Sequence, residues 1–255
     1  MENYTADNYA DKRLDEFTSD SPEGYLYETH CHTNVSSACS KLSPEQIVEL
    51  YVKNGYAGVF ITDHFINGNC VQKIRLEKDY AKQIEAFFDG YRRVKEAGKG
   101  VLDVFCGFEA SYKGTDVLVY GWDEEITKRY SEITSMTMRE FINFANAHGA
   151  LTVQAHPFRE AEYIDHIRLF PETAGIEVYN SSRDYLCNKL GYEYFKAYNE
   201  EYGKAKTAGS DIHIYTLKTL AGMAFGEKLK SEADFIERVK RGEGQLFRKK
   251  NVLAD

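Results

Sequence analysis

Residues 25–33, with the sequence YLYETHCHT, combine a predicted β-strand with two histidines at its end. Aromatic residues and a β-branched threonine favour a strand over Tyr25–His30. His30 and His32 are two residues apart, so their side chains project from the same face of an extended chain, whereas Cys31 points to the other face. Because imidazole is a preferred ligand of zinc and of other transition metal ions, this strand end is a candidate metal site.

From Tyr25 onward, short apolar segments alternate with longer segments of helical periodicity. The segment Ser43–Gln46 has a capping box with proline at the first helical position, and similar start signals occur at Thr137 and Ser231. Repeated strand–helix alternation implies an α/β fold with a mainly parallel sheet, and the number of units favours a closed or distorted barrel. The expected strands are residues 25–30, 57–62, 102–109, 117–120, 151–155, 175–179, 206–209 and 220–225, and the expected helices are 43–55, 77–97, 137–149, 184–202 and 231–242.

The length and composition indicate one globular domain. The chain has 255 residues, of which 43% are hydrophobic and 28% charged, and this composition argues against disorder. Residues 1–24 are polar with charged clusters, which predicts an irregular or loosely helical N-terminal extension. No repeat, low-complexity run or linker interrupts the rest, so residues 25–255 are expected to form a single domain.

The charge and the cysteines restrict the partners and the compartment. Thirty-two basic against forty acidic residues give a net charge of −8, which disfavours a broad electrostatic grip on nucleic acid or on an anionic membrane. The apolar runs are too short to cross a bilayer, and the N-terminus lacks the features of a signal peptide. The five cysteines include no C-x-x-C pair, which is typical of reduced thiols. We therefore expect a soluble cytoplasmic protein, while the sequence gives no indication of its oligomeric state.

Ligand-type residues also lie at the ends of other predicted strands. In an α/β barrel the C-terminal ends of the strands gather at one mouth, so these side chains would converge with His30 and His32. Imidazole and carboxylate ligands in that number suit Zn²⁺, Mn²⁺ or Fe²⁺, and a carboxylate that bridges two ions is common in hydrolytic sites. His148 and His166 fall outside the pattern and are expected to be structural. The strand-end residues are His64, Glu109, His156, Asp211 and His213.

Seven short motifs in this order resemble the PHP (polymerase and histidinol phosphatase) superfamily, from about Tyr25 to about Gly244. The resemblance implies a distorted (β/α)7 barrel with two or three divalent metal ions, and metal-dependent hydrolysis of a phosphate ester by a metal-activated water. The motifs are Thr29–Thr33, Ser43–Glu45 leading to Gly55, Ile61–His64, Gly107–Glu109, Ala155–Pro157, Gly175–Val178 and Gly209–His213.

The resemblance also implies a distribution of metal ligands. The first metal would take His30, His32, Glu109 and Asp211, the second would share Glu109 and take His156, and the third would use His64 and His213. Two departures limit this carry-over. The loop Ser36–Ser40 offers no strong hard ligand for the third metal, and the strand after Glu109 has no histidine for the second, so Asp116 is predicted as its substitute.

Arginines near the strand ends are candidates for binding the substrate phosphate, because a planar guanidinium can bind two phosphate oxygens at once. Arg159, three residues after His156, is placed best, and Arg183 is second. Glu109, Asp211 and His213 are the predicted catalytic residues; His213 could protonate the leaving group if the third metal site is vacant. A nucleophilic role for Cys39 is disfavoured, because the loop lacks the C-x5-R phosphate cradle.

Three function classes remain open from the sequence. A phosphatase acting on a small-molecule or nucleotide phosphomonoester is favoured. A phosphodiesterase or exonuclease on nucleic acid is the second, although the acidic charge opposes it and no polymerase or helix-hairpin-helix segment is present. A non-catalytic metal-binding interaction module is the third, and the complete ligand set opposes it.

Overall fold

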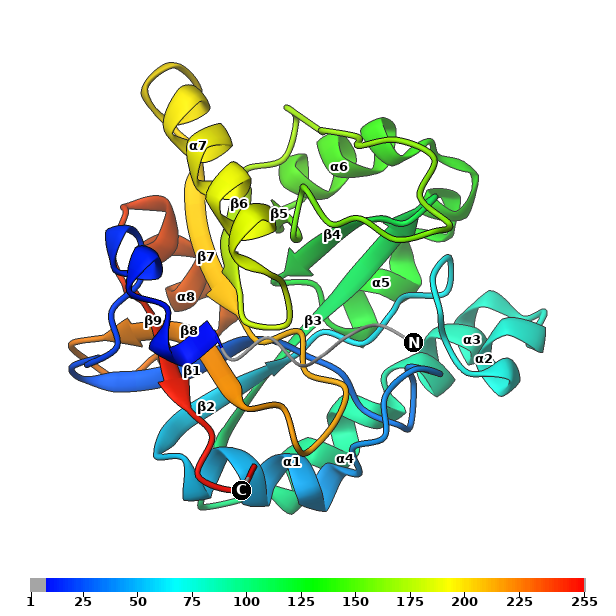
Figure 1. The fold of residues 1–255 in the computed structure, drawn as a ribbon. Coiled ribbons are helices and arrows are strands. Elements are labelled where there is room, and N and C mark those ends of the chain that lie inside the picture. Colours follow the sequence, from blue (N-terminus) through cyan, green and yellow to red (C-terminus); the bar gives the residue numbers. More distant parts are fainter. Residues whose placement is uncertain (1–7, 255) are drawn as a thin grey trace.

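The computed structural model describes residues 8–254, in which nine strands form one curved sheet (Figure 1). Their spatial order is β7-β6-β5-β4-β3-β2-β1-β8-β9, so the first seven strands are neighbours in sequence order. The strands are β1 Tyr25–Cys31, β2 Tyr56–Ile61, β3 Asp103–Tyr112, β4 Thr115–Tyr120, β5 Leu151–Gln154, β6 Gly175–Asn180, β7 Ala205–Gly209, β8 Thr219–Phe225 and β9 Gln245–Lys250.

The seven-stranded part closes into a barrel where β1 meets β7 and the residues that follow it. The Thr29 hydroxyl donates to the carbonyl of Ala208 (2.7 Å), and the backbone N–H of Ile212 donates to the carbonyl of His30 (3.3 Å). The opposite end of β1 pairs with β8 instead, with Tyr25 opposite Phe225. The barrel is therefore closed at the mouth that carries the predicted ligands and opened at the other end, which confirms the expected distorted α/β barrel.

The sheet is less parallel than the sequence predicted. Strands β1–β3 and β5–β7 are parallel, but β4 runs antiparallel to both of its neighbours, and β8 and β9 are also antiparallel. A two-residue turn causes the reversal at β4, because Lys113 and Gly114 both have positive φ (51° and 79°), as a type I′ hairpin requires. As a result, β4 begins at the mouth, where Asp116 pairs with Ser111 of β3.

The capping signals in the sequence mark real helix starts. Ser43 and Thr137 form complete capping boxes with Gln46 and Glu140, and Ser231 accepts a hydrogen bond from the backbone of Asp234. The predicted helix over 77–97 is instead two helices that break at Phe88, where ψ is 2°. The helices are α1 Pro44–Lys53, α2 Gln72–Leu76, α3 Tyr80–Phe87, α4 Asp89–Ala97, α5 Glu124–Arg129, α6 Met138–Ala147, α7 Tyr185–Tyr202 and α8 Glu232–Lys240.

Helices pack around the outside of the barrel (Figure 1). Helix α1 contacts β2 and α4, α6 contacts β5, α7 contacts β6 and α8 contacts β7. The N-terminal residues form two short 3₁₀ helices, Asn8–Ala10 and Lys12–Glu16, and Ser19 pairs with Phe247 of β9. No helix in the described part of the chain is long and apolar enough to cross a membrane.

Candidate metal centre

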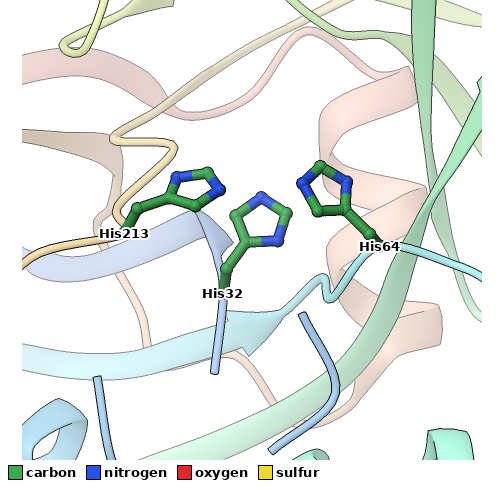
Figure 2. A group of neighbouring side chains, drawn as sticks. All are labelled: His32, His64 and His213. Atoms are coloured by element: carbon green, nitrogen blue, oxygen red, sulfur yellow. The ribbon is translucent and has the colours of Figure 1, made fainter. Parts of the chain in front are cut away.

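Seven of the predicted ligands meet at the mouth of the barrel. They form three overlapping groups, and within each group one ligand atom per residue lies within 4.8 Å of the others. Glu109 is central, because its Oε1 is 3.3 Å from His30 Nε2 and 3.4 Å from His156 Nε2, while its Oε2 is 2.7 Å from His64 Nδ1. The groups are His30, Glu109 and His156; His30, His32 and Asp211; and His32, His64 and His213, which Figure 2 shows side by side.

The backbone adopts unusual conformations to bring these ligands together. His156 and Asp211 both have positive φ (25° and 51°), and non-glycine residues held in this region concentrate at functional sites. Gly209 at the end of β7 allows a close approach, because a Cβ there would lie 2.5 Å from the Cβ of His30. His156 and Asp211 thus accept a conformational cost that places their side chains in the cluster, and Gly209 lets the end of β7 approach His30.

A second carboxylate, Glu177 of β6, lies behind the ligands. Its Oε1 is 2.9 Å from His30 Nδ1, and its Oε2 accepts the backbone N–H of His156 (2.9 Å) and the amide of Asn180 (3.0 Å). A carboxylate that accepts from Nδ1 fixes the imidazole tautomer whose Nε2 lone pair faces a metal. Glu177 therefore orients His30 and positions His156 without itself facing the cluster.

Hydrogen bonds also assign the tautomers of His32 and His213. The Ser37 hydroxyl donates to Asp63 Oδ1 (2.6 Å), so its oxygen can accept from His32 Nδ1 at 3.2 Å. His213 Nδ1 lies 3.0 Å from the carbonyl oxygen of Asp211, which can only accept. In both residues Nδ1 carries a proton, so Nε2 is the nitrogen that is left to bind a metal.

Electrostatic interactions among the ligands shift their pKa values in opposite directions. Burial would raise the pKa of Glu109, but His64 and His30 hold that pKa well below its usual range. Asp211 behaves alike, since His30 and Arg183 outweigh burial and its pKa is well below the usual range. Burial together with His213 and His64 lowers the pKa of His32 well below the usual range, so His32 is neutral. The two carboxylates are thus ionised and His32 is neutral, whereas Glu177 and Asp211 outweigh burial and raise the pKa of His30 well above its usual range, and Glu109 does the same for His64.

Several buried ligand atoms have no hydrogen-bond partner. They are His30 Nε2, His32 Nε2, His64 Nδ1 and both carboxylate oxygens of Glu109. The short contact between His64 and Glu109 is a charge pair without the alignment of a hydrogen bond. Buried polar atoms are almost always paired, and a group left unpaired points to a catalytic role or to an ion that satisfies it. This set of nitrogen and carboxylate donors therefore fits divalent metal ions.

The remaining predicted residues line the same mouth. A cavity of about 770 Å³ is bordered by Asp116, Arg159 and Arg183 together with the ligands Glu109 and Asp211. Arg159 lies 3.3 Å from Asp116 Oδ2 and also pairs with Tyr163, while Arg183 donates to Asp211 Oδ2 at 2.5 Å. Asp116 Oδ2 is 4.0 Å from His156 Nε2, so the predicted substitute ligand lies at the edge of the cluster and is closer to Arg159.

Cys39 is a mouth residue that the sequence did not indicate as a ligand. Its side chain lines the cavity together with His64 and His213 and is partly exposed. Burial would raise the pKa of this thiol, but hydrogen bonds with His213 and His64 lower it to about 6. A loop residue has no periodicity that predicts its direction, which explains why this contact was missed.

Glu177 and Ser37 were also missed as supporting residues. An inward-facing carboxylate inside the β6 segment is visible in the sequence, whereas nothing in the sequence marks Ser37. The two histidines expected outside the site do lie outside it: His148 caps the end of α6, with Nδ1 2.7 Å from the carbonyl of Phe144, and His166 is exposed beside Asp165.

Comparisons with known proteins agree with this fold. The PHP domain family matches the chain over residues 28–239. A solved structure of a proposed metal-dependent phosphoesterase from Bifidobacterium adolescentis is 14% identical, with a TM-score of 0.53 over 86% of this chain and 96% of its own. PsfC from Pseudomonas syringae is also 14% identical, with a TM-score of 0.52 over 88% of this chain and 90% of its own. A search of curated proteins found no match.

The two structures support the barrel fold alone, since their sequence identity is low. The family match is stronger evidence, because it spans most of the chain and includes every residue of the ligand cluster. Together with that cluster it indicates a metal-dependent hydrolase. The chain belongs to the PHP domain family.

Proposed function

We propose that this protein hydrolyses phosphate esters with the help of two or three divalent metal ions, Zn²⁺, Mn²⁺ or Fe²⁺. The observation that carries the proposal is the position of two guanidinium groups beside the ligand cluster. Arg159 and Arg183 border the same cavity as Glu109 and Asp211, and each pairs with a carboxylate at its edge. A site in which guanidinium groups lie beside metal ligands is complementary in charge and geometry to a phosphoryl group.

Different residues would bind the metal ions and orient the substrate in such a reaction. His30, His32, Glu109 and Asp211 would hold one ion, and Glu109 with His156 would hold a second, with Asp116 at the edge. When bound, divalent ions would supply Lewis-acid chemistry, by activating a water as the nucleophile and by neutralising charge on the phosphoryl oxygens. Arg159 and Arg183 would orient the ester by binding its non-bridging oxygens.

Two features favour a small-molecule phosphomonoester over nucleic acid. The net charge of −8 opposes binding to a polyanion. A second cavity of about 520 Å³ adjoins the first, with Ile66, Asn67 and Ser111 in both walls, and offers room for the organic part of the ester. Hydrolysis of a phosphodiester is the alternative function.

The proposal is tested by assaying the chelator-treated protein after reloading with Mn²⁺ or Zn²⁺. We expect metal-dependent release of phosphate from p-nitrophenyl phosphate, slower turnover of bis(p-nitrophenyl) phosphate and competitive inhibition by inorganic phosphate. The variant His166→Ala is a matched control, since this histidine is exposed and outside the cluster. Faster turnover of the diester would favour the alternative, and no metal-dependent hydrolysis of either ester would overturn the proposal.

A further inference from the structure

Two cations in the wall of the mouth cavity lie apart from its acidic side chains. Arg75 from helix α2 and Lys113 from the turn between β3 and β4 both line this cavity. Within residues 8–254 neither forms an ion pair with a carboxylate, whereas Arg159 and Arg183 each pair with a carboxylate of the mouth. The cavity therefore carries positive charge that the described part of the chain does not pair with an acidic residue.

The contact of Arg75 holds its guanidinium without pairing its charge. Its Nη2 donates to the carbonyl oxygen of Cys70 (2.9 Å), which is a neutral acceptor. A guanidinium has five N–H donors in a planar fork, so further donors are left for an oxyanion. The nearby wall of the cavity is formed by Asn67 and Asn69, whose amides are neutral and do not compete for the arginine as a carboxylate would.

The backbone at Lys113 is in a conformation that is costly for a lysine. Its φ is 51°, in the left-handed region, and type I′ turns favour asparagine, aspartate or glycine at this position. The other two non-glycine residues with positive φ in the described chain, His156 and Asp211, belong to the ligand cluster, and such conformations concentrate at functional sites. A lysine at this turn supplies a positive charge at the mouth that asparagine would not.

Contacts around the turn fix the place of Lys113 beside the cavity. Arg168 Nη1 donates to the carbonyl oxygen of Lys113 (3.3 Å), and Asn67 Oδ1 accepts the backbone N–H of Ser111 (3.2 Å). The ammonium itself lies 5.6 Å from the ring centroid of Tyr112, an exposed tyrosine, and a cation–π contact of this kind is weak. The backbone of the turn is thus held in place, while the ammonium is able to bind an anion in the cavity.

We propose that Arg75 and Lys113 bind a second anionic group of the substrate, while the ester phosphate occupies the metal centre. The inference rests on the proposed function and narrows its substrate class to phosphate esters whose alcohol part carries a carboxylate or a further phosphate. The carboxylates of the cluster would repel such a group, so its charge is best placed beside cations that have no acidic neighbour. In a chain with a net charge of −8, this local pair of cations favours an anionic alcohol part over a neutral one.

The test compares ligands that differ only in the second charge, and it does not depend on catalysis. ω-Hydroxyalkyl phosphonates, ω-phosphonoalkanoates and alkane bisphosphonates of increasing chain length are titrated by calorimetry into the Zn²⁺-loaded protein. We expect the second anion to tighten binding by about 10-fold at the length that spans both sites, because a charge-assisted pair is strong but water screens these exposed cations. The carboxylate and bisphosphonate series show which of the two anions is preferred.

Substitutions should remove the advantage of the second charge. In Arg75→Gln and in Lys113→Gln the affinity ratio between charged and hydroxyl ligands should fall to about a third of the wild-type value, and in the double variant to about one. A substitution that only disturbed the metal centre would weaken both ligands and leave the ratio unchanged. The control Lys78→Gln, an exposed lysine outside the mouth cavity, should keep the wild-type ratio. Higher ionic strength should lower the ratio in the wild type.

The outcomes separate this inference from the proposed function. A ratio near one at every chain length, a ratio that persists in the double variant, or no binding of any phosphonate would overturn the second anion site. If the wild type hydrolyses p-nitrophenyl phosphate in a metal-dependent way but the ratio is near one, the anion site fails while the proposed function stands. If the ratio responds as expected but no ester is hydrolysed, the proposed function fails while the anion site stands.

Discussion

Arg248 and Glu109 are both charged side chains with no exposed surface, yet their surroundings differ completely. Arg248 lies in β9 beneath the N-terminal segment, and its guanidinium donates to several acceptors. Nε donates to the carbonyl of Tyr9 (3.2 Å), Nη1 to the hydroxyl of Thr18 (2.7 Å) and Nη2 to Asp15 Oδ1 (2.5 Å). Every nitrogen of this buried charge therefore has a partner within the chain.

Glu109 accepts no hydrogen bond at either carboxylate oxygen. Its neighbours are the imidazoles of His64, His30 and His156 at distances of 2.7 to 3.4 Å. The nitrogens that His64 and His30 direct at it have no hydrogen-bond partner either. A buried charge is tolerated when its partners compensate for the loss of water, and Arg248 meets that condition fully. The comparison shows that hydrogen-bond partners, rather than burial, distinguish a structural charge from a metal ligand. All nitrogens of Arg248 have partners within the chain, whereas the unpartnered atoms around Glu109 require metal ions as their partners.

The largest effect is expected from Glu109→Gln. The amide keeps the size of the side chain but loses the charge and the capacity to bridge two ions, so bound metal should fall. We expect kcat/KM for p-nitrophenyl phosphate to fall by at least about 10³-fold, which corresponds to about 4 kcal/mol of lost transition-state stabilisation.

Elemental analysis and the shift in Tm on adding Zn²⁺ provide the checks for this variant. The wild type should gain thermal stability from the ion, because a ligand that binds only the folded state stabilises it, and Glu109→Gln should gain much less. Full metal occupancy in the variant would show that Glu109 is a paired structural charge like Arg248.

The second prediction concerns Arg248→Met, which fills most of the volume but removes the donors. Thr18 and the carbonyls of the N-terminal segment lose their partner, so the free energy of unfolding should fall by about 2–4 kcal/mol. Metal content and activity of the folded protein should stay unchanged. Urea unfolding with Lys12→Met as a control on an exposed residue measures the effect; a loss of metal in Arg248→Met would contradict the separation of the two regions.

The same comparison explains what could be predicted from the sequence. The ligands were predictable because residues of one chemical type recur where strands end, and a barrel brings strand ends together. Strand β9 was not predicted, since QLFRKK has a charged residue at an inward position and a buried arginine conceals the pattern of a strand. The burial of Arg248 cannot be predicted from the sequence pattern, because its hydrogen-bond partners Tyr9, Thr18 and Asp15 are far away along the chain.

The wrong strand direction at β4 and the wrong single helix over 77–97 each have a cause in the residues nearby. The mainly parallel sheet was wrong at β4 because the turn at Lys113–Gly114 is short, and the strand candidates alone do not give a direction. The single helix over 77–97 was wrong because Phe87 and Phe88 are both buried, and the break at Phe88 lets adjacent residues enter the core. Cys39 and Ser37 lie in a loop, where direction depends on contacts made only after folding.

The third prediction addresses the paired charge at the edge of the centre. Arg159 is no ligand, so Arg159→Ala should leave metal content nearly unchanged. Loss of a charge-assisted hydrogen bond to phosphate, worth about 1.5–3 kcal/mol, should lower kcat/KM by about 10- to 100-fold. The exposed residue Arg139 provides the control variant Arg139→Ala. Full activity of Arg159→Ala would assign this arginine to structure, as a partner of Asp116 and Tyr163.

The smallest effect is expected from Glu177→Gln. Both carboxylate oxygens of Glu177 accept hydrogen bonds, and through them this residue orients ligands of the cluster, whose own atoms lack partners. Glu177 accepts from His30 Nδ1 and from the backbone N–H of His156, and glutamine keeps one of these acceptors. If the new amide faces His30, two donors oppose each other and the imidazole is driven towards the tautomer that protonates Nε2, the atom directed at Glu109. Metal affinity should then fall by about 10-fold, which is the lower end of the loss expected for a residue that hydrogen-bonds to a ligand, with little change in the fold.

Zn²⁺ titration by calorimetry measures this change in affinity, with the exposed Glu162→Gln as control. An affinity equal to that of the wild type would mean that Glu177 acts like the partners of Arg248, holding strands together without tuning the ligands.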